Sequence, residues 1–306
     1  MIDLILGSHM MSHTKFKHFF SKIKRFRWLF LLAPLYFIPG CAQKLFYVPS
    51  HGKYDSPQRL NLLFEDVTFP SQDGTLLNGW FIPAQVVKNG HSTRVDAKGT
   101  VIHFHGNAGN ITSHLSFVDW LPQRGFNVFM FDYRGYGTSK GKPTPRGLFE
   151  DSNSALDYVR NRTDIDPKKL FVFGQSLGGT NAIAAVGSGN KQGILAVAIE
   201  ATFNSYSSIA NDKVYGSGLL MNDDYSANKV ISEISPIPFL LIHSTTDKVV
   251  PYHHGQQLFE LAKMPKQFIT IEGGSHIQSL VSQDGKKYQD IMIKFFEQAL
   301  QKIPSE

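Results

Sequence analysis

The sequence contains a single cysteine, Cys41, in 306 residues, so no intrachain disulfide can form. It has no His-Glu-x-x-His motif and no pair of neighbouring cysteines, the patterns that commonly supply zinc ligands. It also lacks a glycine-rich phosphate-binding loop with the spacing of a dinucleotide fingerprint after its first strand. We therefore expect no metal and no other cofactor.

A basic surface for nucleic acid is also missing. The formal net charge is +6, but the first 40 residues account for +5 of it, and residues 41–306 are nearly balanced at +1. No stripe of Lys and Arg with interleaved aromatic residues occurs in the body of the chain. The basic character thus belongs mostly to the N-terminal segment, and we expect no nucleic-acid partner.

The N-terminal segment has the composition of an export signal. Lys15 to Arg27 is basic, and residues 28–38 form an apolar run of about eleven residues, which is too short to span a bilayer as a free helix. Residues 7–10, Gly-Ser-His-Met, indicate an expression-vector remnant within residues 1–10, with Met11 as the native start. Residues 11–40 are therefore predicted to be a signal peptide.

Cys41 ends this segment in a sequence, Ile38-Pro39-Gly40-Cys41, that resembles a bacterial lipobox. The resemblance implies that Cys41 is lipidated, that residues 41–62 form a tether and lead-in, and that the protein is exported and membrane-anchored in the cell envelope. The alternative is a leader that stays attached as an uncleaved anchor. Both alternatives hold the body of the protein at a membrane surface.

Strand and helix patterns alternate through the rest of the chain. The inner strands are continuous apolar runs, as expected where helices cover both faces of a parallel sheet. The polar segment 86–98 is predicted to be a loop. Strands are predicted at 66–70, 76–82, 100–104, 127–131, 170–173, 194–199, 239–243 and 268–271, and helices at 113–124, 147–162, 177–186, 254–263 and 278–300.

The most informative motif is Gly174-Gln175-Ser176-Leu177-Gly178, which lies between a predicted strand and a predicted helix. Gly-x-Ser-x-Gly in this context is typical of a nucleophile elbow, a sharp turn that exposes a serine Oγ above a sheet. The pattern alone is common, so the partners of Ser176 have to support it.

An acid and a base follow Ser176 in chain order. Asp247 comes shortly after the strand 239–243, 71 residues after Ser176. His276 comes after the last strand, 29 residues after Asp247. Imidazole can take the serine proton near neutral pH, and a carboxylate can orient it. Glu200, at the end of the strand 194–199, is the rival acid. Four other histidines are expected to have structural roles. His103 is expected to pack in the core and His105 to brace its loop, and His253 and His254 are expected at the surface or at a helix start.

These features together resemble the α/β-hydrolases over about residues 60–300. The segments that carry the resemblance are His105-Gly106-Asn107-Ala108, Asp132-Tyr133-Arg134-Gly135-Tyr136-Gly137 and Gly174 to Gly179. Within that superfamily they resemble the branch of Bem46-like serine hydrolases and of α/β-hydrolase domain-containing proteins 13 and 17, some of which cleave acyl thioesters. The resemblance implies an α/β domain over 63–303 with a mostly parallel sheet of about eight strands, helices on both faces and a short cap. Ser244 stands where the family usually has glycine before the acid.

The oxyanion hole requires two backbone N–H groups. One is expected from Leu177, directly after the nucleophile and at a helix start. The resemblance places the other at Asn107, with Ala108 as the alternative. The short segment between Glu200 and Ile237 is the expected cap, and Phe203, Tyr206, Leu219 and Leu220, together with Tyr215 and Met221, are its candidates for lining an acyl pocket.

Three functions fit this sequence. The first is a membrane-tethered serine hydrolase that cleaves small carboxylic esters or thioesters through an acyl-enzyme on Ser176. The second is a serine peptidase of the prolyl-oligopeptidase-like type, although the chain has no room for the propeller of those enzymes. The third is a lipoprotein with no catalytic role that binds a lipid or a partner. The oligomeric state is not predicted by the sequence.

Overall fold

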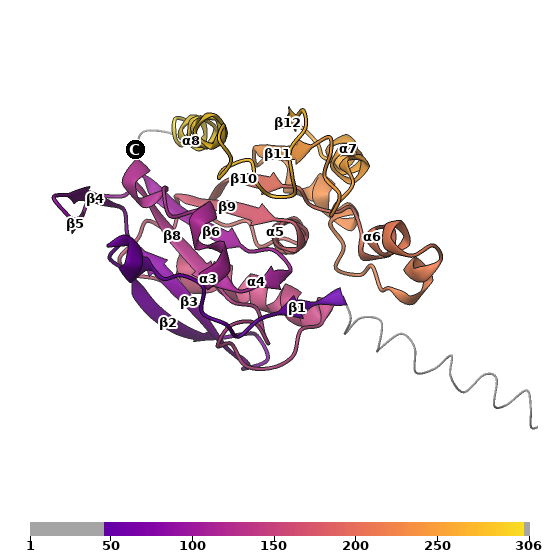
Figure 1. The fold of residues 1–306 in the computed structure, drawn as a ribbon, viewed down its shortest axis with the longest axis horizontal. Coiled ribbons are helices and arrows are strands. Elements are labelled where there is room, and N and C mark those ends of the chain that lie inside the picture. Colours follow the sequence, from indigo (N-terminus) through magenta and orange to yellow (C-terminus); the bar gives the residue numbers. More distant parts are fainter. Residues whose placement is uncertain (1–45, 303–306) are drawn as a thin grey trace, which may run out of the picture.

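The computed structural model describes residues 46–302. Its centre is an eight-stranded sheet, with layers of helices on both faces (Figure 1). The strands lie in the order β12-β11-β10-β9-β6-β8-β3-β2; only β3 pairs antiparallel to its neighbours on both sides. Their bounds are β2 Glu65–Pro70, β3 Leu76–Ile82, β6 Gly99–Phe104, β8 Phe126–Phe131, β9 Leu170–Gln175, β10 Ile194–Glu200, β11 Phe239–Ser244 and β12 Lys266–Ile271. This arrangement confirms the predicted fold class.

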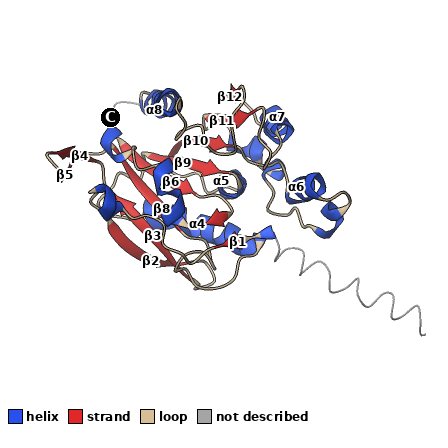
Figure 2. Ribbon diagram, viewed as in Figure 1, coloured by secondary structure: helices blue, strands red, loops and turns tan. Residues whose placement is uncertain are grey.

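The two faces of the sheet are covered by different helices (Figure 2). On one face, α4 (Pro145–Arg160), α5 (Leu177–Gly187) and α7 (Tyr252–Leu261) bury apolar side chains such as Leu156, Ile183 and Leu258. On the other face, α8 (Gly285–Leu300) and the segment that begins with α3 (Ile111–His114) pack against the sheet. Every residue of β6, β8 and β9 is buried, which explains why apolar residues predominate in these strands.

Three predicted elements differ from the structure. The helix expected over 113–124 is divided into α3 and two 3-10 turns, Leu115–Phe117 and Pro122–Arg124; Pro122, which has no N–H to continue a helix, opens the second turn. The helix expected from residue 278 begins only at Gly285.

The segment 86–98 is not a loop throughout. It contributes to a hairpin of β4 (Gln85–Lys88) and β5 (His91–Arg94). Asn89 and Gly90 form its two-residue turn with φ of 51° and 76°, the left-handed conformation that Asn-Gly adopts readily. The Asn-Gly pair was therefore the sequence signal for this hairpin.

The short cap lies between β10 and β11. It consists of α6 (Tyr206–Lys213) followed by the 3-10 turns Ser217–Leu220, Ala227–Lys229 and Ile231–Ile234. In Figure 1 it forms the lobe at the right of the molecule, beside the start of the described chain. Within residues 46–302, no helix combines the length and the apolar character needed to cross a membrane.

Candidate active site

Ser176 lies in a strained turn between β9 and α5. Its φ of 52° and ψ of −119° are unusual for a residue with a side chain. The glycines on either side allow this turn. A Cβ at position 174 would lie 2.8 Å from the carbonyl oxygen of Gly178, and one at position 178 would collide with the backbone of Phe104. The local sequence therefore produces the elbow geometry expected from the motif.

Asp247 and His276 are joined by a hydrogen bond of 2.7 Å between Nδ1 of the imidazole and Oδ2 of the carboxylate. Because a carboxylate accepts, Nδ1 carries the proton, and Nε2 is left with the lone pair a general base requires. The other carboxylate oxygen accepts backbone N–H groups from Val249 and Val250 at 2.8 and 2.9 Å. The side chain of Asp247 is fully buried, and that of His276 is mostly buried.

The pKa of Asp247 is held below its ordinary value. Burial by itself raises the pKa, but the contacts with His243 and His276 and the backbone N–H of Val250 outweigh it. The carboxylate is therefore ionised at neutral pH, as an orienting acid must be.

Glu200, the rival acid, serves a different part of the structure. Its Oε1 accepts the N–H of Ser279 at 2.9 Å, and its Oε2 accepts the side-chain amide of Gln175 at 2.7 Å. Its backbone carbonyl also accepts the N–H of Ser176 at 2.9 Å. Glu200 thus links the elbow to the segment that follows His276, and its carboxylate oxygens are occupied by donors other than the imidazole.

Short hydrogen bonds connect the loop that carries Asp247 to the loop that carries His276. Ser244 Oγ lies 3.0 Å from the carbonyl oxygen of Gly273 and 2.9 Å from that of Gly274. Thr246 Oγ1 donates to Gly274 O at 2.8 Å. The serine that replaces the family glycine therefore has a function in joining the loops, which motif comparison did not indicate.

The two residues predicted to supply oxyanion donors, Leu177 and Asn107, line the same cavity as Ser176. Leu177 is the first residue of α5, so its N–H is at a helix N-terminus. The side chain of Asn107 is held by the lead-in segment: its amide donates to Phe46 O at 2.6 Å, and its oxygen accepts Val48 N–H and Tyr136 Oη–H at 3.2 and 2.8 Å. Ala108, the alternative donor, pairs with Val48 in a two-stranded sheet of β1 (Val48–Pro49) and β7 (Ala108–Gly109).

A largely apolar cavity of about 450 Å³ lies beside Ser176, Leu177 and Asn107. Of the residues predicted to line it, Phe203 and Met221 do so. Tyr206 is instead fully buried in the core, and Tyr215 and Leu219 point outward, so these expectations were wrong. Leu220 is also absent from the wall. Other wall residues that the sequence did not indicate are Phe46, Ile209, Ala210, Lys213, Val214, Ser217, Val249 and Val250.

One group among the described residues has side chains close enough to hold a metal: Asp212, His253 and His254. The Nδ1 of His254 accepts the N–H of Asn204 at 3.3 Å, so its proton is on Nε2, which donates to Asp212 at 2.9 Å. The group is therefore explained as a hydrogen-bonded link between α6 and α7. His254 is at a helix start, as expected, but it is buried and not at the surface.

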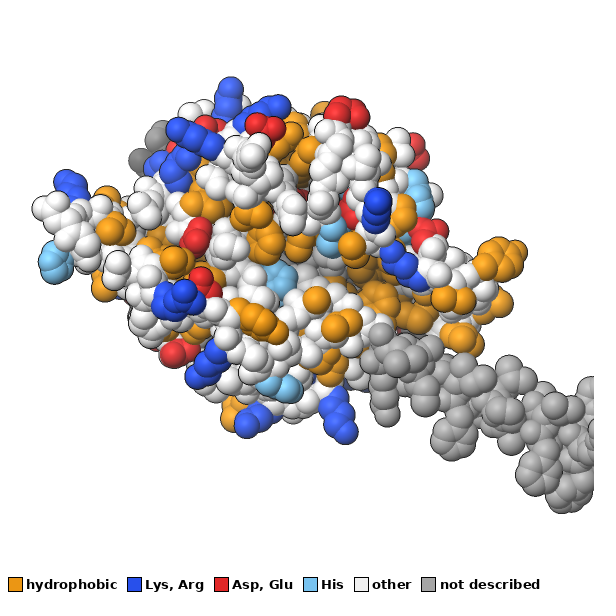
Figure 3. Space-filling model, viewed as in Figure 1, with side chains coloured by type: hydrophobic (Ala, Val, Ile, Leu, Met, Phe, Trp, Pro, Cys, Tyr) orange, Lys and Arg blue, Asp and Glu red, His pale blue; other side chains and the backbone are white. Residues whose placement is uncertain are grey.

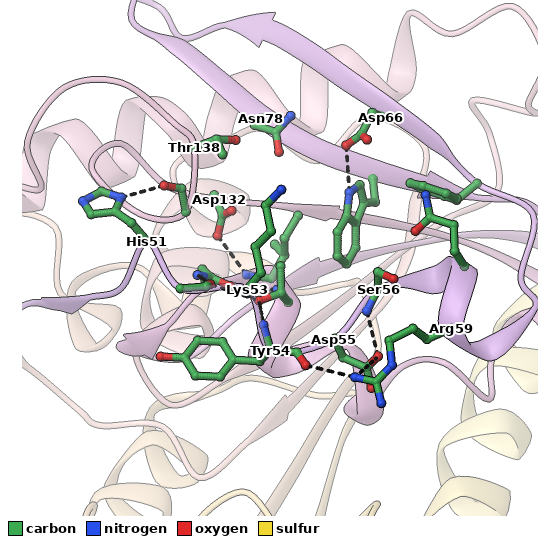
Figure 4. A pocket seen from close by; sticks show the side chains of 18 residues that line it. His51, Lys53, Tyr54, Asp55, Ser56, Arg59, Asp66, Asn78, Asp132 and Thr138 are labelled. Carbon is green, nitrogen blue, oxygen red and sulfur yellow. Dashed lines mark hydrogen bonds and ion pairs between the residues drawn. The ribbon is translucent and has the colours of Figure 1, made fainter.

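A second cavity, of about 550 Å³, lies under the lead-in segment and is shown in Figure 4. Its carboxylates have partners within or beside it: Asp66 accepts from Trp80, and Asp55 lies near Arg59. His51 bonds the carbonyl of Gly137, and Asp132 accepts the N–H of Ile111. None of the triad candidates lines this cavity. It is separate from the candidate active site.

Comparisons with known proteins bear on the family and the fold. A family model described as serine aminopeptidase, S33, matches residues 95–211. The chain is 45% identical over 266 residues to the uncharacterized protein YfhR of Escherichia coli O157:H7, covering 87% of this chain and 91% of that protein. It is 33% identical over 280 residues to the α/β hydrolase domain-containing protein WAV2 of Arabidopsis thaliana, covering 83% and 87%.

The fold is also similar to that of solved structures. The Pyrococcus furiosus esterase Pf2001 superposes with a TM-score of 0.67 over 83% of this chain and 97% of that one, at 17% sequence identity. At that identity the likeness concerns the fold alone, whereas the similarity to WAV2 extends over most of both sequences. On this evidence the chain belongs to the α/β-hydrolase superfamily.

Proposed function

We propose that this protein is a serine hydrolase that cleaves carboxylic esters or thioesters through an acyl-enzyme on Ser176. The observation that carries the proposal is the 2.7 Å hydrogen bond between Asp247 and His276, on loops linked to the strained elbow that presents Ser176. A buried acid, an imidazole with a free Nε2 and a serine that lines a cavity from a strained turn form the constellation that acyl transfer requires.

The reaction proceeds in two halves. Ser176 Oγ attacks the acyl carbon while His276 Nε2 takes its proton, and the N–H groups of Leu177 and Asn107 bind the developing oxyanion. The imidazolium then gives its proton to the departing alcohol or thiol, which leaves the acyl group on Ser176. Water, deprotonated by the same imidazole, attacks the acyl-enzyme, and the imidazolium returns that proton to Ser176 Oγ as the bond to the acyl carbon breaks and the acid is released.

The cavity favours an acyl group over a peptide N-terminus. Among the residues that line it, Lys213 is the only charged one, and no acid is present to bind an amine. The matched family is described as an aminopeptidase, so peptidase activity is the second candidate. Aminoacyl and peptidyl amides compared with p-nitrophenyl esters distinguish the two, and we expect turnover of the esters.

Labelling of the full chain with a fluorophosphonate probe tests the activated serine. We expect labelling of the wild type and of Ser217→Ala, a serine in the same cavity, and none of Ser176→Ala, whose ester turnover should fall by at least about 10³-fold. A p-nitrophenyl series from acetate to palmitate measures the length of acyl chain that the cavity accepts. Absence of labelling in the folded wild type would favour the third function, binding without catalysis.

The membrane tether is part of the proposal. Cys41 and the signal peptide lie outside the described residues, and the proposal rests on the sequence of the leader. Lipidation at Cys41 and export would place the domain at a membrane of the cell envelope. Cys41→Ser should move the protein to the soluble fraction; an unchanged membrane fraction would contradict lipidation and favour the uncleaved anchor.

A further inference from the structure

The cap carries an exposed apolar turn. Val214, Tyr215 and Leu219 are 64%, 101% and 91% exposed, and they lie within six residues after α6. Hydrogen bonds from Ser217 N to Val214 O and from Leu219 N to Gly216 O fold these residues into a compact turn. In Figure 3 hydrophobic side chains gather on this projecting lobe. We call residues 214–219 the cap turn. Large apolar side chains rarely project this far unless they contact something.

The inner side of the cap turn forms the wall of the acyl cavity. Val214 and Ser217 line the cavity, and Lys213, directly before the turn, does as well. The same short segment therefore presents apolar groups outward and encloses the space beside Ser176. A ligand bound by the outward groups would lie next to the entrance of the cavity.

Phe46, the first described residue, lies at the same cavity. Its ring packs against those of Phe203 and Tyr206 at 5.8 and 5.3 Å between centroids. Cys41 is five residues earlier, a span of at most about 18 Å even when fully extended. A leader or lipid in the bilayer would thus hold the cavity entrance and the cap turn close to the membrane surface.

We infer that the cap turn is a membrane-contact surface, through which the acyl cavity faces a phospholipid bilayer and receives acyl chains from it. Tyr215 and Leu219 enter the headgroup region, where an aromatic ring with a polar end and an aliphatic side chain both fit. Lys213 and Lys248, joined at the base of the turn by a hydrogen bond from Lys213 Nζ to Lys248 O, suit the phosphate groups there. The inference rests on the proposed function for the use of the cavity, but the contact itself does not depend on catalysis.

Quenching by brominated lipids tests the contact directly. Full-length Tyr215→Trp and Met264→Trp variants are reconstituted into phosphatidylcholine–phosphatidylglycerol vesicles whose acyl chains carry bromine. Met264 is a matched control because it is 68% exposed and lies just before the amino end of β12. It is therefore at the opposite end of the sheet from the carboxyl ends of the parallel strands. We expect quenching beyond the wild-type level only for Tyr215→Trp. Equal quenching of both variants, or none beyond wild type, would overturn the inference.

A second experiment tests the use of the surface. The double variant Tyr215→Ser/Leu219→Ser alters side chains that do not line the cavity, so turnover of a water-soluble short ester should stay within about twofold of wild type. Turnover of a long-chain acyl ester embedded in the vesicles should fall at least about tenfold, while Met264→Ser leaves both unchanged. An unchanged ratio of the two activities would contradict the inference. If the double variant also loses a dimer in sedimentation while the ratio stays unchanged, the cap turn contacts a second copy of the chain and not the membrane.

The two proposals fail in different ways. If the wild type neither reacts with fluorophosphonate nor hydrolyses the short ester, the proposed function is wrong, and the quenching experiment still decides whether the cap turn contacts lipid. If the short ester is hydrolysed and Tyr215→Trp is not quenched, the function stands and the membrane contact is wrong.

Discussion

At the scale of single residues, two buried carboxylates near Ser176 have different partners. Asp247 contacts the imidazole, whereas Glu200 accepts hydrogen bonds from Gln175 and from the backbone of Ser279. Chain position alone left both as candidates for the acid. Their hydrogen bonds place His276 against Asp247 and not against Glu200, which supports the proposal that Asp247 orients the base.

We therefore expect Asp247→Asn to lower kcat by about 10³- to 10⁴-fold. The amide favours the tautomer of His276 that carries its proton on Nε2, and it does not stabilise the imidazolium that forms during the reaction. Glu200→Gln should keep kcat within about tenfold and lower the free energy of unfolding by about 1–3 kcal/mol, since one buried hydrogen bond becomes mismatched. Steady-state kinetics and urea unfolding of both variants measure this. The reverse order of activities would assign the acid to Glu200.

At the scale of elements, the catalytic loops depend on hydrogen bonds between them. Ser244 at the end of β11 is bonded to two carbonyl groups of the loop that leads to His276. Ser244→Ala should lower kcat about tenfold with little change in KM, because the acid and the base lose part of their alignment. The control is Ser232→Ala, at a half-buried position whose hydroxyl bonds only the neighbouring Glu233. An unchanged kcat with a lowered Tm would show that the bonds stabilise the fold only.

The loop after β8 is held by a buried arginine. The guanidinium of Arg134 lies 2.8 Å from Asp151 on α4, whose side chain is fully buried, and also 2.8 Å from Asp73. Arg134→Met should lower the free energy of unfolding by about 3–5 kcal/mol, because the carboxylate of Asp151 remains buried without its partner. Chemical denaturation measures the loss, and Arg134→Met/Asp151→Leu should recover part of it. Turnover per fluorophosphonate-reactive site should stay near wild type.

At the scale of the whole molecule, buried histidines make stability depend on pH. Burial, with a smaller contribution from His105, lowers the pKa of His114 to about 3. Burial also lowers the pKa of His254 to about 4, with His253 as the next cause. The unfolded chain binds protons at these groups below about pH 6.5 and the folded chain does not, so stability falls as pH drops from 6.5 toward 3.

Two carboxyl groups oppose this trend: burial and then Asp55 raise the pKa of Asp119 to about 6, and burial raises the pKa of Asp151, so the folded state gains protons there first. Burial lowers the pKa of His103 as well, so three histidines act against these two carboxyl groups, and we expect a net loss of stability between pH 7 and 4.5. His114→Gln should reduce that loss by about 2 kcal/mol, and the exposed His91→Gln should leave it unchanged. Urea unfolding at the two pH values is the measurement, and an equal loss in wild type and His114→Gln would contradict the role of His114.

The sequence by itself determined the local features. Continuous apolar runs predicted the inner strands, and the Gly-x-Ser-x-Gly motif predicted the elbow, because both follow from short-range sterics and from burial on two faces. The order of Ser176, Asp247 and His276 also followed from strand positions. These features depend on a few neighbouring residues, so the chain specifies them without reference to distant contacts.

Only the tertiary structure decided which distant side chains meet. It distinguished Asp247 from Glu200, joined Ser244 to the histidine loop, and brought Phe46 to the cavity from the far N-terminal side. It also turned Tyr215 and Leu219 outward and Tyr206 into the core, although all three are apolar candidates in one short segment. Composition cannot order such residues, because the direction of each side chain depends on how the cap packs against the sheet and the lead-in segment.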